Sequence, residues 1–591
     1  MSQGLWRNAL GHFDWNRILM RCTFTFGACT LFFVACAAQA AELKSGESKP
    51  ALGSGVSSSG AGEVGIVDFI NAEIRKGWAD SGYTASPKAT DGEWCRRAFL
   101  DIIGRVPTVG ELNLFMSEPA NVKKQKLLDR LLDSDEYAEE YANYWATVWS
   151  NLLIGRPPQR RVNGELVNRD GMHQYLRVAF LRNKPYDQMV YELVSATGNT
   201  SPDEQSYNGA TNFIASMMKR DDPMLTQATS KTAKIFLGLQ VQCTQCRNHP
   251  FNDWKQEQFW SMNAFFRQTH VREVSRQGRD VESAALENSD FRGEGSTPNE
   301  AEIYYELRNG TMAVAYPTFV DGTKINPSGY VSEIDRRSEL GKLMIKSEYL
   351  GKAISNRLWG HFLGYGFTKP VDDLGPHNVP SHPELLDRMG KEFAGQGHDY
   401  KKLIRWIVMT EAYSLSSRVM PKNKKDDPSL GEKPKFSRFY LRQMQPEQLY
   451  DSLQVAKFLP SEDRREKGTL DDRLRARREW MGQFTVNLGN DEGEDLTTFN
   501  GTIPQILMMM NGPLIKEVTG TEGGSLLSKL AASGMKPQEV IDYMYLAAFA
   551  RKPGPQDLAM CQAALAAHGA GAGYQDIWWA LLNSNEFIFV H

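Results

Sequence analysis

Apolar residues recur at helical spacing along most of the chain. Ile66, Ile70 and Ile74 come every fourth residue, as on one face of a helix. We therefore expect ordered structure from Val64 onward. A second helix is predicted to begin near Asp135, and its positions i, i+4, i+7, i+8 and i+12 are the aromatic residues Tyr137, Tyr141, Tyr144, Trp145 and Trp149. Such a stripe is typical of a buried helix face, and a cofactor-stacking box is the alternative.

Two further helices flank a short polar segment. The first is predicted over Ala228–Val241. The second begins with a capping box of Asp253 and Gln256 and continues to Phe266. The segment between them, residues 243–249, reads Cys-Thr-Gln-Cys-Arg-Asn-His. Its two thiols and its imidazole are therefore expected on a turn between helices.

Strand patterns are few. Thr311–Phe319 is the clearest strand candidate. Gln277–Glu302 is polar and poor in apolar residues, so we interpret it as a surface loop or an interdomain segment. We interpret Met420–Phe436 and Asn490–Asp495 as loops. Helical spacing resumes near Ile334. The pattern therefore predicts a mainly α fold, with two helical domains and minor β elements.

The first forty residues have the pattern of an export signal. A basic region ends at Arg21, an uncharged run extends from Cys22 to Ala37, and Ala38-Gln39-Ala40 fits the small-residue rule for cleavage. The apolar run is shorter than the roughly 20 residues of a membrane span. We therefore expect cleavage near Ala40 and a periplasmic or secreted protein. An uncleaved anchor and a lipidated Cys36 are the alternatives, and either would tether the chain to a membrane.

The domain organisation follows from these patterns. A chain of 591 residues is too long for one core, so at least two domains are expected. We assign residues 1–40 to the signal peptide, 41–63 to a Gly/Ser-rich linker, 64–272 to an N-terminal helical domain, 273–333 to a linking segment with short strands, and 334–591 to a C-terminal helical domain. No stretch after the signal is apolar and long enough to be expected to span a bilayer.

Composition and charge exclude some classes of function. The formal net charge is −3, so the chain lacks the basic excess that a nucleic-acid-binding surface requires, and we expect no nucleic-acid partner. The H-E-x-x-H, P-loop and Rossmann signatures do not occur in the sequence. The sequence thus assigns no reaction, and it leaves open whether the chain is an enzyme.

Several segments occur in an order that resembles a known family. They are residues 96–108 (RRAFLDIIGRVPT), 127–132 (LLDRLL), 242–251 (QCTQCRNHPF), 264–266 (AFF), 356–359 (NRLW), 372–373 (DD), 381–387 (SHPELLD), 551–553 (RKP) and 579–587 (WALLNSNEF). In this the chain resembles exported two-domain proteins of planctomycete-type bacteria, with domain of unknown function 1549 in the N-terminal half and domain of unknown function 1553 in the C-terminal half. The resemblance implies cytochrome-c-like or polysaccharide-degrading envelope proteins as partners, and it implies no particular reaction.

Many members of that family have C-x-x-C-H-x-H-P at the cysteine segment, a pattern that attaches haem. Here Arg247 stands in place of the haem-ligating histidine, and a guanidinium has no lone pair with which to bind iron. Covalent haem c is therefore not the leading interpretation for this chain. The other cysteines outside the signal, Cys95 and Cys561, are expected to be buried and inert.

Three interpretations of Cys243, Cys246 and His249 remain open. The two thiolates and the imidazole could hold a metal ion, zinc or iron, with Asp253, His382 or water as the fourth ligand. In an oxidising compartment the two cysteines could instead close into a structural disulfide. The third interpretation is a thiol–disulfide redox couple, although no thioredoxin-like βαβ pattern surrounds the motif.

A second polar cluster lies in the C-terminal half and consists of Asn356, Arg357, Trp359, Asp372, Asp373, His382 and Glu384. Histidine and carboxylates can exchange protons with a substrate. On that ground the weak catalytic candidates are His382, Glu384, Asp373 and Arg357. The structural alternative is a helix start, with Ser381 as N-cap, Pro383 in the first turn and Glu384 closing a capping box.

The leading functional expectation is a metal- or haem-associated, redox-linked protein of the cell envelope. It depends on the family resemblance and on the thiol segment. The alternative is a non-catalytic protein that binds carbohydrate or a protein partner, with Cys243 and Cys246 joined in a structural disulfide.

Overall fold

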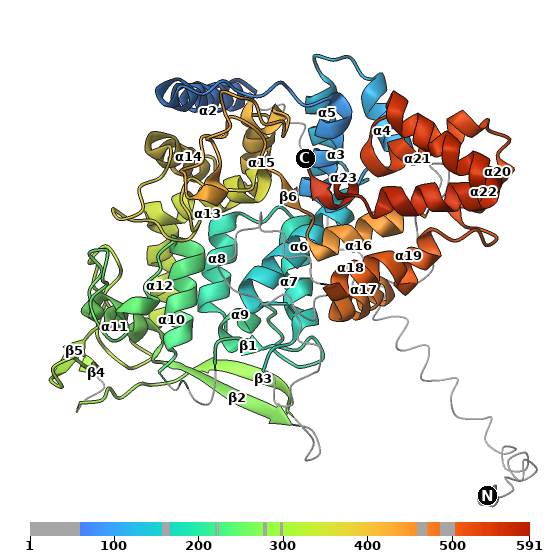
Figure 1. Cartoon of the computed structure of the whole chain (residues 1–591). Coiled ribbons are helices and arrows are strands. Elements are labelled where there is room, and N and C mark those ends of the chain that lie inside the picture. The colour runs from blue at the N-terminus through green and yellow to red at the C-terminus, as the bar shows by residue number, and fades with distance from the viewer. Residues whose placement is uncertain are drawn as a thin grey trace, which may run out of the picture. The chain divides into compact units, whose positions relative to one another are not determined.

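The computed structural model describes residues 60–156, 166–218, 222, 224–275, 281–295, 300–457, 470–484 and 503–591 (Figure 1). The predicted signal peptide, nearly all of the linker and the predicted acidic loop Asn490–Asp495 lie outside these residues. Within the described ranges, no helix combines the length and the apolar character that crossing a membrane requires.

Helices dominate the first half of the described chain. They are α2 (Gly60–Ser81), α3 (Asp91–Ile103), α4 (Val109–Ser117), α5 (Lys123–Asp133), α6 (Ala138–Ile154), α7 (Arg169–Leu181), α8 (Tyr186–Ser195), α9 (Thr211–Ala215), α10 (Thr226–Thr232), the π-helix η2 (Ala233–Leu237), the 3₁₀-helix η3 (Gln242–Thr244), α11 (Gln256–Asn263) and the 3₁₀-helix η4 (Ala264–Phe266).

The second half is also helical. Its elements are α12 (Arg336–Lys346), α13 (Glu348–Leu363), α14 (Pro383–Gly395), α15 (Tyr400–Val408), the 3₁₀-helices η6 (Ala412–Ser414) and η7 (Pro428–Leu430), α16 (Pro446–Val455), α17 (Leu470–Phe484), α18 (Ile503–Asn511), α19 (Pro513–Val518), α20 (Leu526–Ala532), α21 (Pro537–Phe549), α22 (Pro555–Leu582) and α23 (Asn585–Ile588). The predicted mainly α fold is confirmed, and helical structure resumes at Arg336, close to the predicted Ile334.

The β structure is small and antiparallel. β1 (Gly198–Asn199), β3 (Val281–Asn288) and β2 (Thr269–Ser275) form one sheet in the order β1-β3-β2. β4 (Ile303–Glu306) pairs with β5 (Met312–Ala315), so the strand predicted within Thr311–Phe319 is confirmed. β6 (Arg442–Gln443) pairs with β7 (Phe589–Val590) at the end of the chain.

The apolar faces that the spacing predicts are buried. Ile66, Ile70 and Ile74 lie on α2 with at most 5% of their surface exposed. α2 begins at Gly60, so the last four residues of the predicted linker are helical. The five rings of the aromatic stripe are all buried around α6, which confirms a core face and not a cofactor-stacking box. Both Cys95 and Cys561 are buried, as predicted.

One predicted loop is wrong in its middle part. Residues 281–288, inside the predicted loop Gln277–Glu302, form β3, which pairs with both β1 and β2. Ala284, Ala285 and Leu286 on this strand are buried. Two of these three residues are alanines, whose small side chains give a weak apolar signal. The strand is therefore stabilised by its neighbours in the sheet rather than by local propensity.

Arginines of α3 connect the two halves of the chain. Arg96 donates to the carbonyl of Phe587 (2.6 Å), and Arg97 donates to the carbonyl of Leu415 (3.1 Å). Asp101 is fully buried and forms an ion pair with Arg442. Residues 61–591 accordingly form one compact unit. The boundaries 64–272, 273–333 and 334–591 stay predictions.

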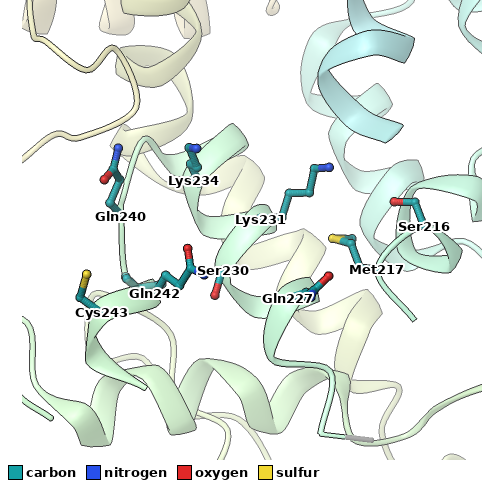
Figure 2. A pocket seen from close by; sticks show the side chains of 10 residues that line it. Ser216, Met217, Gln227, Ser230, Lys231, Lys234, Gln240, Gln242 and Cys243 are labelled. Carbon is teal, nitrogen blue, oxygen red and sulfur yellow. The ribbon is translucent and has the colours of Figure 1, made fainter. Parts of the chain in front are cut away.

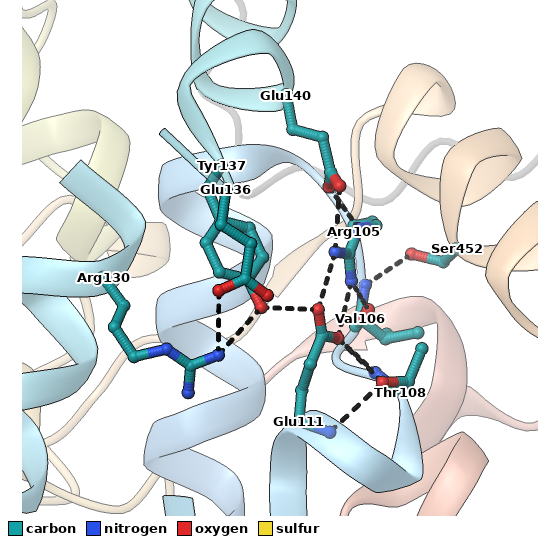
Figure 3. A network of polar contacts seen from close by, with 9 residues as sticks. All are labelled: Arg105, Val106, Thr108, Glu111, Arg130, Glu136, Tyr137, Glu140 and Ser452. Atoms are coloured by element: carbon teal, nitrogen blue, oxygen red, sulfur yellow. Dashed lines mark hydrogen bonds and ion pairs between the residues drawn. The ribbon is translucent and has the colours of Figure 1, made fainter. Parts of the chain in front are cut away.

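A second buried network fixes the segment after α3 (Figure 3). Arg105 donates two hydrogen bonds to Glu111 (3.0 Å each) and two to Glu140 (2.5 and 3.2 Å). Glu111 also accepts from the hydroxyl of Tyr137 (2.8 Å), and it closes a capping box with Thr108 at the start of α4. A buried charge is tolerated when it is paired and hydrogen-bonded in this way.

Candidate functional site

The helix that leads to the cysteines ends earlier than predicted. α10 continues into the π-helix η2, which ends at Leu237 with Gly238 as its C-cap, so the helix predicted over Ala228–Val241 extends four residues too far. Gly238 has φ +67°, and a Cβ atom there would lie 2.9 Å from Cδ1 of Leu374. The Leu374 N–H donates to the Gly238 carbonyl at 2.7 Å. Only glycine meets both requirements, the positive φ and the close approach.

The residues 242–249, called the thiol turn below, are held by α11. The carbonyl of Gln245 accepts from the Trp260 indole (3.0 Å) and from the Gln256 amide (3.2 Å). The backbone N–H of Gln256 donates to Oδ1 of Asn248 at 3.0 Å. Thr244 is buried, and its hydroxyl donates to the carbonyl of Val241. The turn is thus anchored by its inward-facing residues.

The predicted capping box at the start of α11 is wrong. The N-cap is Lys255, and its N–H donates to the side chain of Gln258 at 2.8 Å. The predicted partner Gln256 instead uses its side-chain amide for the carbonyls of Gln245 and Glu306. The local pattern predicts that the Gln256 side chain bonds back to Asp253, but its tertiary contacts with Gln245 and Glu306 use that side chain instead.

Cys243 and Cys246 are free thiols, and both are exposed. Thr244 faces the core between them, which leaves the two cysteines on the solvent side of the turn. Arg247 follows them and is also exposed. The thiols are therefore accessible to other molecules, in contrast to the buried Cys95 and Cys561.

His249 is engaged in shaping the turn. Its ring Nδ1 accepts from the backbone N–H groups of Phe251 (3.2 Å) and Asn252 (3.1 Å). The backbone N–H of His249 donates to the carbonyl of Trp254 (2.8 Å). Desolvation lowers the pKa of His249, and the nearby His377 lowers it further. With Nδ1 accepting, the proton of the neutral ring lies on Nε2. A histidine that binds a metal through Nε2 normally donates from Nδ1, so this arrangement opposes ligation.

The expected metal ligands are not assembled in the structure. Within the described ranges, no three histidine, cysteine, aspartate or glutamate side chains are placed to hold one ion. Cys243 and Cys246 supply two thiols, but His249 is not oriented as a third ligand. The residues present therefore do not fit a three-ligand zinc or iron site or a haem, and the metal interpretation stays a prediction from the sequence.

The acidic pair of the C-terminal half lies against the helix that precedes the thiol turn. Asp372 accepts from the Gln240 amide at 3.0 Å. Its Oδ2 lies 3.9 Å from Nζ of Lys234 and 3.7 Å from Nη2 of Arg357. Arg357, one of the weak candidates, is thus close to the segment that carries Cys243.

Asp373, a second weak candidate, is hydrogen-bonded to His377. Oδ1 of Asp373 is 3.0 Å from Nε2 of His377. The His377 ring lies 5.9 Å, between centroids, from the ring of His249. His377 was not predicted, although its i, i+4 spacing from Asp373 is a signal that could have suggested the pair. These contacts bring the 372–378 loop beside the thiol turn.

His382 and Glu384 lie elsewhere, and the predicted capping box there is wrong. α14 begins at Pro383 with His382 as N-cap, without a side-chain capping bond. Glu384 is exposed and pairs with Lys76 at 3.3 Å. His382 is buried against α2, where a Cβ on Gly77 would lie 2.4 Å from its Nε2. Burial lowers the pKa of His382 to about 3, so it is a neutral packing residue.

A polar pocket of about 300 Å³ opens beside the thiol turn (Figure 2). Among the residues that the structure describes, it is lined by Ser216, Met217, Gln227, Ser230, Lys231, Lys234, Gln240, Val241, Gln242 and Cys243. They come from the end of α9, from α10, from the π-helix η2 and from the thiol turn. π-Helical segments occur frequently at functional sites. Sequence reasoning missed this pocket because its lysines and glutamines form no recognisable motif.

Each half of the chain matches a different protein family. Residues 69–271 match the family described as "Protein of unknown function (DUF1549)", and residues 336–497 match "Protein of unknown function (DUF1553)". The chain belongs to this two-domain family. The first match contains the thiol turn and the pocket, and the second begins at Arg336 and contains the 372–378 loop. No curated protein and no solved structure matches the chain.

Proposed function

We propose that this chain is an exported, redox-linked protein of the cell envelope whose working group is the thiol pair Cys243 and Cys246. The observation that carries the proposal is the exposure of both free thiols on one short turn. A C-x-x-C pair of this kind can exchange two electrons by closing into a disulfide. The chain would then act on a disulfide or a thiol of another molecule.

The surroundings of the pair support a reversible reaction. The thiol turn is anchored through Thr244, Gln245 and Asn248, and none of these contacts involves a cysteine. Closing or opening a disulfide therefore breaks no hydrogen bond that holds the turn. Both sulfurs are also open to an incoming partner, as thiol–disulfide exchange requires.

Export is supported by the N-terminal pattern, which lies outside the described residues. The basic region, the apolar run and Ala38-Gln39-Ala40 together form a secretion signal. An oxidising compartment supplies the disulfide partners that such a pair needs. The implied association with cytochrome-like envelope proteins belongs to the same proposal.

A redox titration tests the function. The mature chain is equilibrated with mixtures of reduced and oxidised dithiothreitol, alkylated, digested and analysed by mass spectrometry. We expect Cys243 and Cys246 to lose alkylation together in one two-electron step. Cys95 and Cys561 serve as internal controls, because burial should keep them as thiols throughout.

Metal analysis and a visible spectrum of the same sample separate the alternatives. About one zinc or iron per chain, lost in Cys243→Ser, would replace the proposal with the metal interpretation. A pair that remains oxidised below about −300 mV would indicate a structural disulfide and so the binding or scaffold alternative.

A further inference from the structure

A large apolar side chain is exposed shortly after the thiol turn. Phe251 has 81% of its surface open to solvent, more than any other large apolar residue that the structure describes. Such exposure forgoes most of the free energy that burying a phenylalanine contributes to folding. A single exposed apolar residue is common on protein surfaces, so its neighbours and the way it is held decide whether it has a role.

The loop after the thiol turn holds Phe251 in this exposed place. Its backbone N–H donates to Nδ1 of His249 at 3.2 Å, and the centroids of the two rings lie 6.2 Å apart. His249 is itself held, because its backbone N–H donates to Trp254 and its ring centroid lies 5.9 Å from that of His377. The loop is thus ordered before a partner arrives, which lowers the entropy cost of binding.

The exposed side chains around the thiols have the composition of an interface. In the stretch that ends with Phe251 they are Gln242, Cys243, Cys246, Arg247, Asn248, Pro250 and Phe251. None of these seven is a lysine, an aspartate or a glutamate, which are depleted from protein–protein interfaces, whereas arginine and aromatic residues are enriched there. A polypeptide is therefore the kind of partner that this surface matches.

Phe251 is within reach of a substrate chain that is bonded to the thiols. It comes five residues after Cys246, so the two Cα atoms are at most about 19 Å apart. An extended polypeptide covers that distance in about six residues. A polypeptide can therefore offer its disulfide to the thiols and a nearby apolar side chain to Phe251, whereas a small disulfide has no such side chain to offer.

We propose that the thiol pair acts on disulfides of polypeptides, that Phe251 determines this specificity and that His249 is the positioning residue that holds it. This rests on the proposed function and names its substrate class. Phe251 packs against an apolar side chain of the substrate within about six residues of the disulfide.

The exchange itself takes two steps. One thiolate of the pair bonds to a substrate sulfur, the substrate S–S bond breaks, and the leaving thiolate takes a proton from water. The second thiolate then attacks the sulfur of the first cysteine and releases the other substrate thiolate, which is also protonated by water. The substrate gains two electrons, and the cysteine pair loses them.

Two matched peptides test the substrate class. Each is a chain of about 13 glycines and serines with one central cysteine, and each is used as its symmetric disulfide. One of them has leucines in place of some serines on both sides of the cysteine. The rate at which each oxidises the reduced wild-type pair is measured by alkylation and mass spectrometry. We expect the leucine peptide to react about tenfold faster, because it buries part of the Phe251 ring. Equal rates would overturn the proposal.

Variants of Phe251 test the residue itself. Phe251→Ala should abolish the preference and leave the rate of the serine peptide unchanged, whereas Phe251→Leu should keep most of the preference. The matched control is Met560→Ala, which removes an exposed apolar side chain of α22 and should react as the wild type does. A preference for the leucine peptide that survives in Phe251→Ala would refute the role of Phe251.

Two variants of His249 test its positioning role. His249→Ala removes the acceptor of the Phe251 N–H, whereas His249→Asn keeps a side-chain oxygen that can accept it. We expect the preference for the leucine peptide to fall about threefold in His249→Ala and to remain in His249→Asn. An undiminished preference in His249→Ala would refute the positioning role.

The two proposals can fail separately. If the pair titrates in the redox experiment but the two peptides react at one rate, the thiol function stands and the polypeptide specificity is wrong. If Cys243 and Cys246 never form a disulfide in that experiment, both proposals fall.

Discussion

The arginine networks around α3 and the lysine pocket beside the thiol turn are both rich in cations, but the surroundings of those cations differ. Arg105 is enclosed by Glu111 and Glu140 (Figure 3). Arg97 is enclosed by backbone carbonyls of the second half, among them that of Leu415. The lysines of the pocket instead line a space of about 300 Å³ (Figure 2). A guanidinium enclosed by its partners holds the fold together, whereas the pocket lysines lie at the edge of a space of the size that small molecules occupy.

Burial also changes the acid–base behaviour of two arginines of α3. It lowers the pKa of Arg96 and of Arg97 to about 10, which still leaves both guanidinium groups charged at neutral pH. Their charge must therefore be met by the carbonyls of Phe587 and Leu415. The segment 96–108 belongs to the family resemblance, yet the side chains that it buries have structural roles.

The largest effect is expected where a buried ion pair is broken. Asp101→Ala leaves Arg442 buried without its carboxylate and also removes the acceptor of the Tyr413 hydroxyl. We expect the free energy of unfolding, measured by denaturant titration, to fall by about 3–5 kcal/mol. The control is Glu348→Ala, which breaks an exposed pair with Lys352 and should cost less than about 1 kcal/mol. Equal losses in the two variants would contradict the structural role of α3.

The next effect concerns pH. Burial lowers the pKa of His361 and of His382 to about 3, far below the roughly 6.5 of an unfolded histidine. The unfolded chain therefore binds more protons below pH 6.5, so stability present above that pH is lost as the pH falls toward 3. Each histidine contributes roughly 1 kcal/mol per pH unit in this window.

His382→Gln tests this dependence by comparison with the wild type. Between pH 6.5 and 4 we expect the slope of unfolding free energy against pH to be shallower by about one proton in the variant. An unchanged slope would mean that His382 is accessible and protonated in the folded protein. That outcome would restore it as a catalytic candidate.

A smaller effect is expected at the junction between the π-helix and the 372–378 loop. Gly238→Ala places a side chain at φ +67° and against Leu374, so we expect a loss of about 2 kcal/mol. Gly322→Ala is the matched control: it has φ +89° but open space for a Cβ, so only the backbone cost of about 1 kcal/mol should appear. If denaturant titration gives the same loss of unfolding free energy for Gly238→Ala and Gly322→Ala, the contact with Leu374 adds no cost.

The smallest change in stability is expected at the thiols themselves. Cys243→Ser and Cys246→Ser replace exposed side chains and should shift the free energy of unfolding by less than about 0.5 kcal/mol. Cys95→Ser, the control, puts a hydroxyl into the core and should cost about 1–3 kcal/mol. A large loss at either exposed thiol would favour a structural role for the pair.

The sequence predicted what depends on local periodicity. The buried faces of α2 and α6 follow from apolar spacing, and the placement of the cysteines on a turn follows from the helices around it. The predicted capping boxes failed because Gln256 bonds to the carbonyls of Gln245 and Glu306, and because Glu384 pairs with Lys76. Partners far away in the sequence decide such contacts, and no local pattern contains them.

The site was predicted only in part for the same reason. Cys243, Cys246 and His249 follow from their spacing, but the role of His249 as an acceptor for backbone N–H groups depends on the path of the following loop. The pocket joins Lys231 and Lys234, on one helical segment, to Cys243, which comes nine residues after Lys234 and beyond the helix end at Gly238. A motif search does not detect groups that only the fold brings together.

The most direct test of the account is the trapping of a mixed disulfide on variants that keep one cysteine of the pair Cys243 and Cys246. Cys246→Ser and Cys243→Ser are each treated with 3,3′-dithiodipropionate, and the modified residue is followed by mass spectrometry. The account predicts that a mixed disulfide forms on Cys243 in Cys246→Ser and on Cys246 in Cys243→Ser, because both thiols are exposed. Failure of either variant to form a mixed disulfide would contradict it.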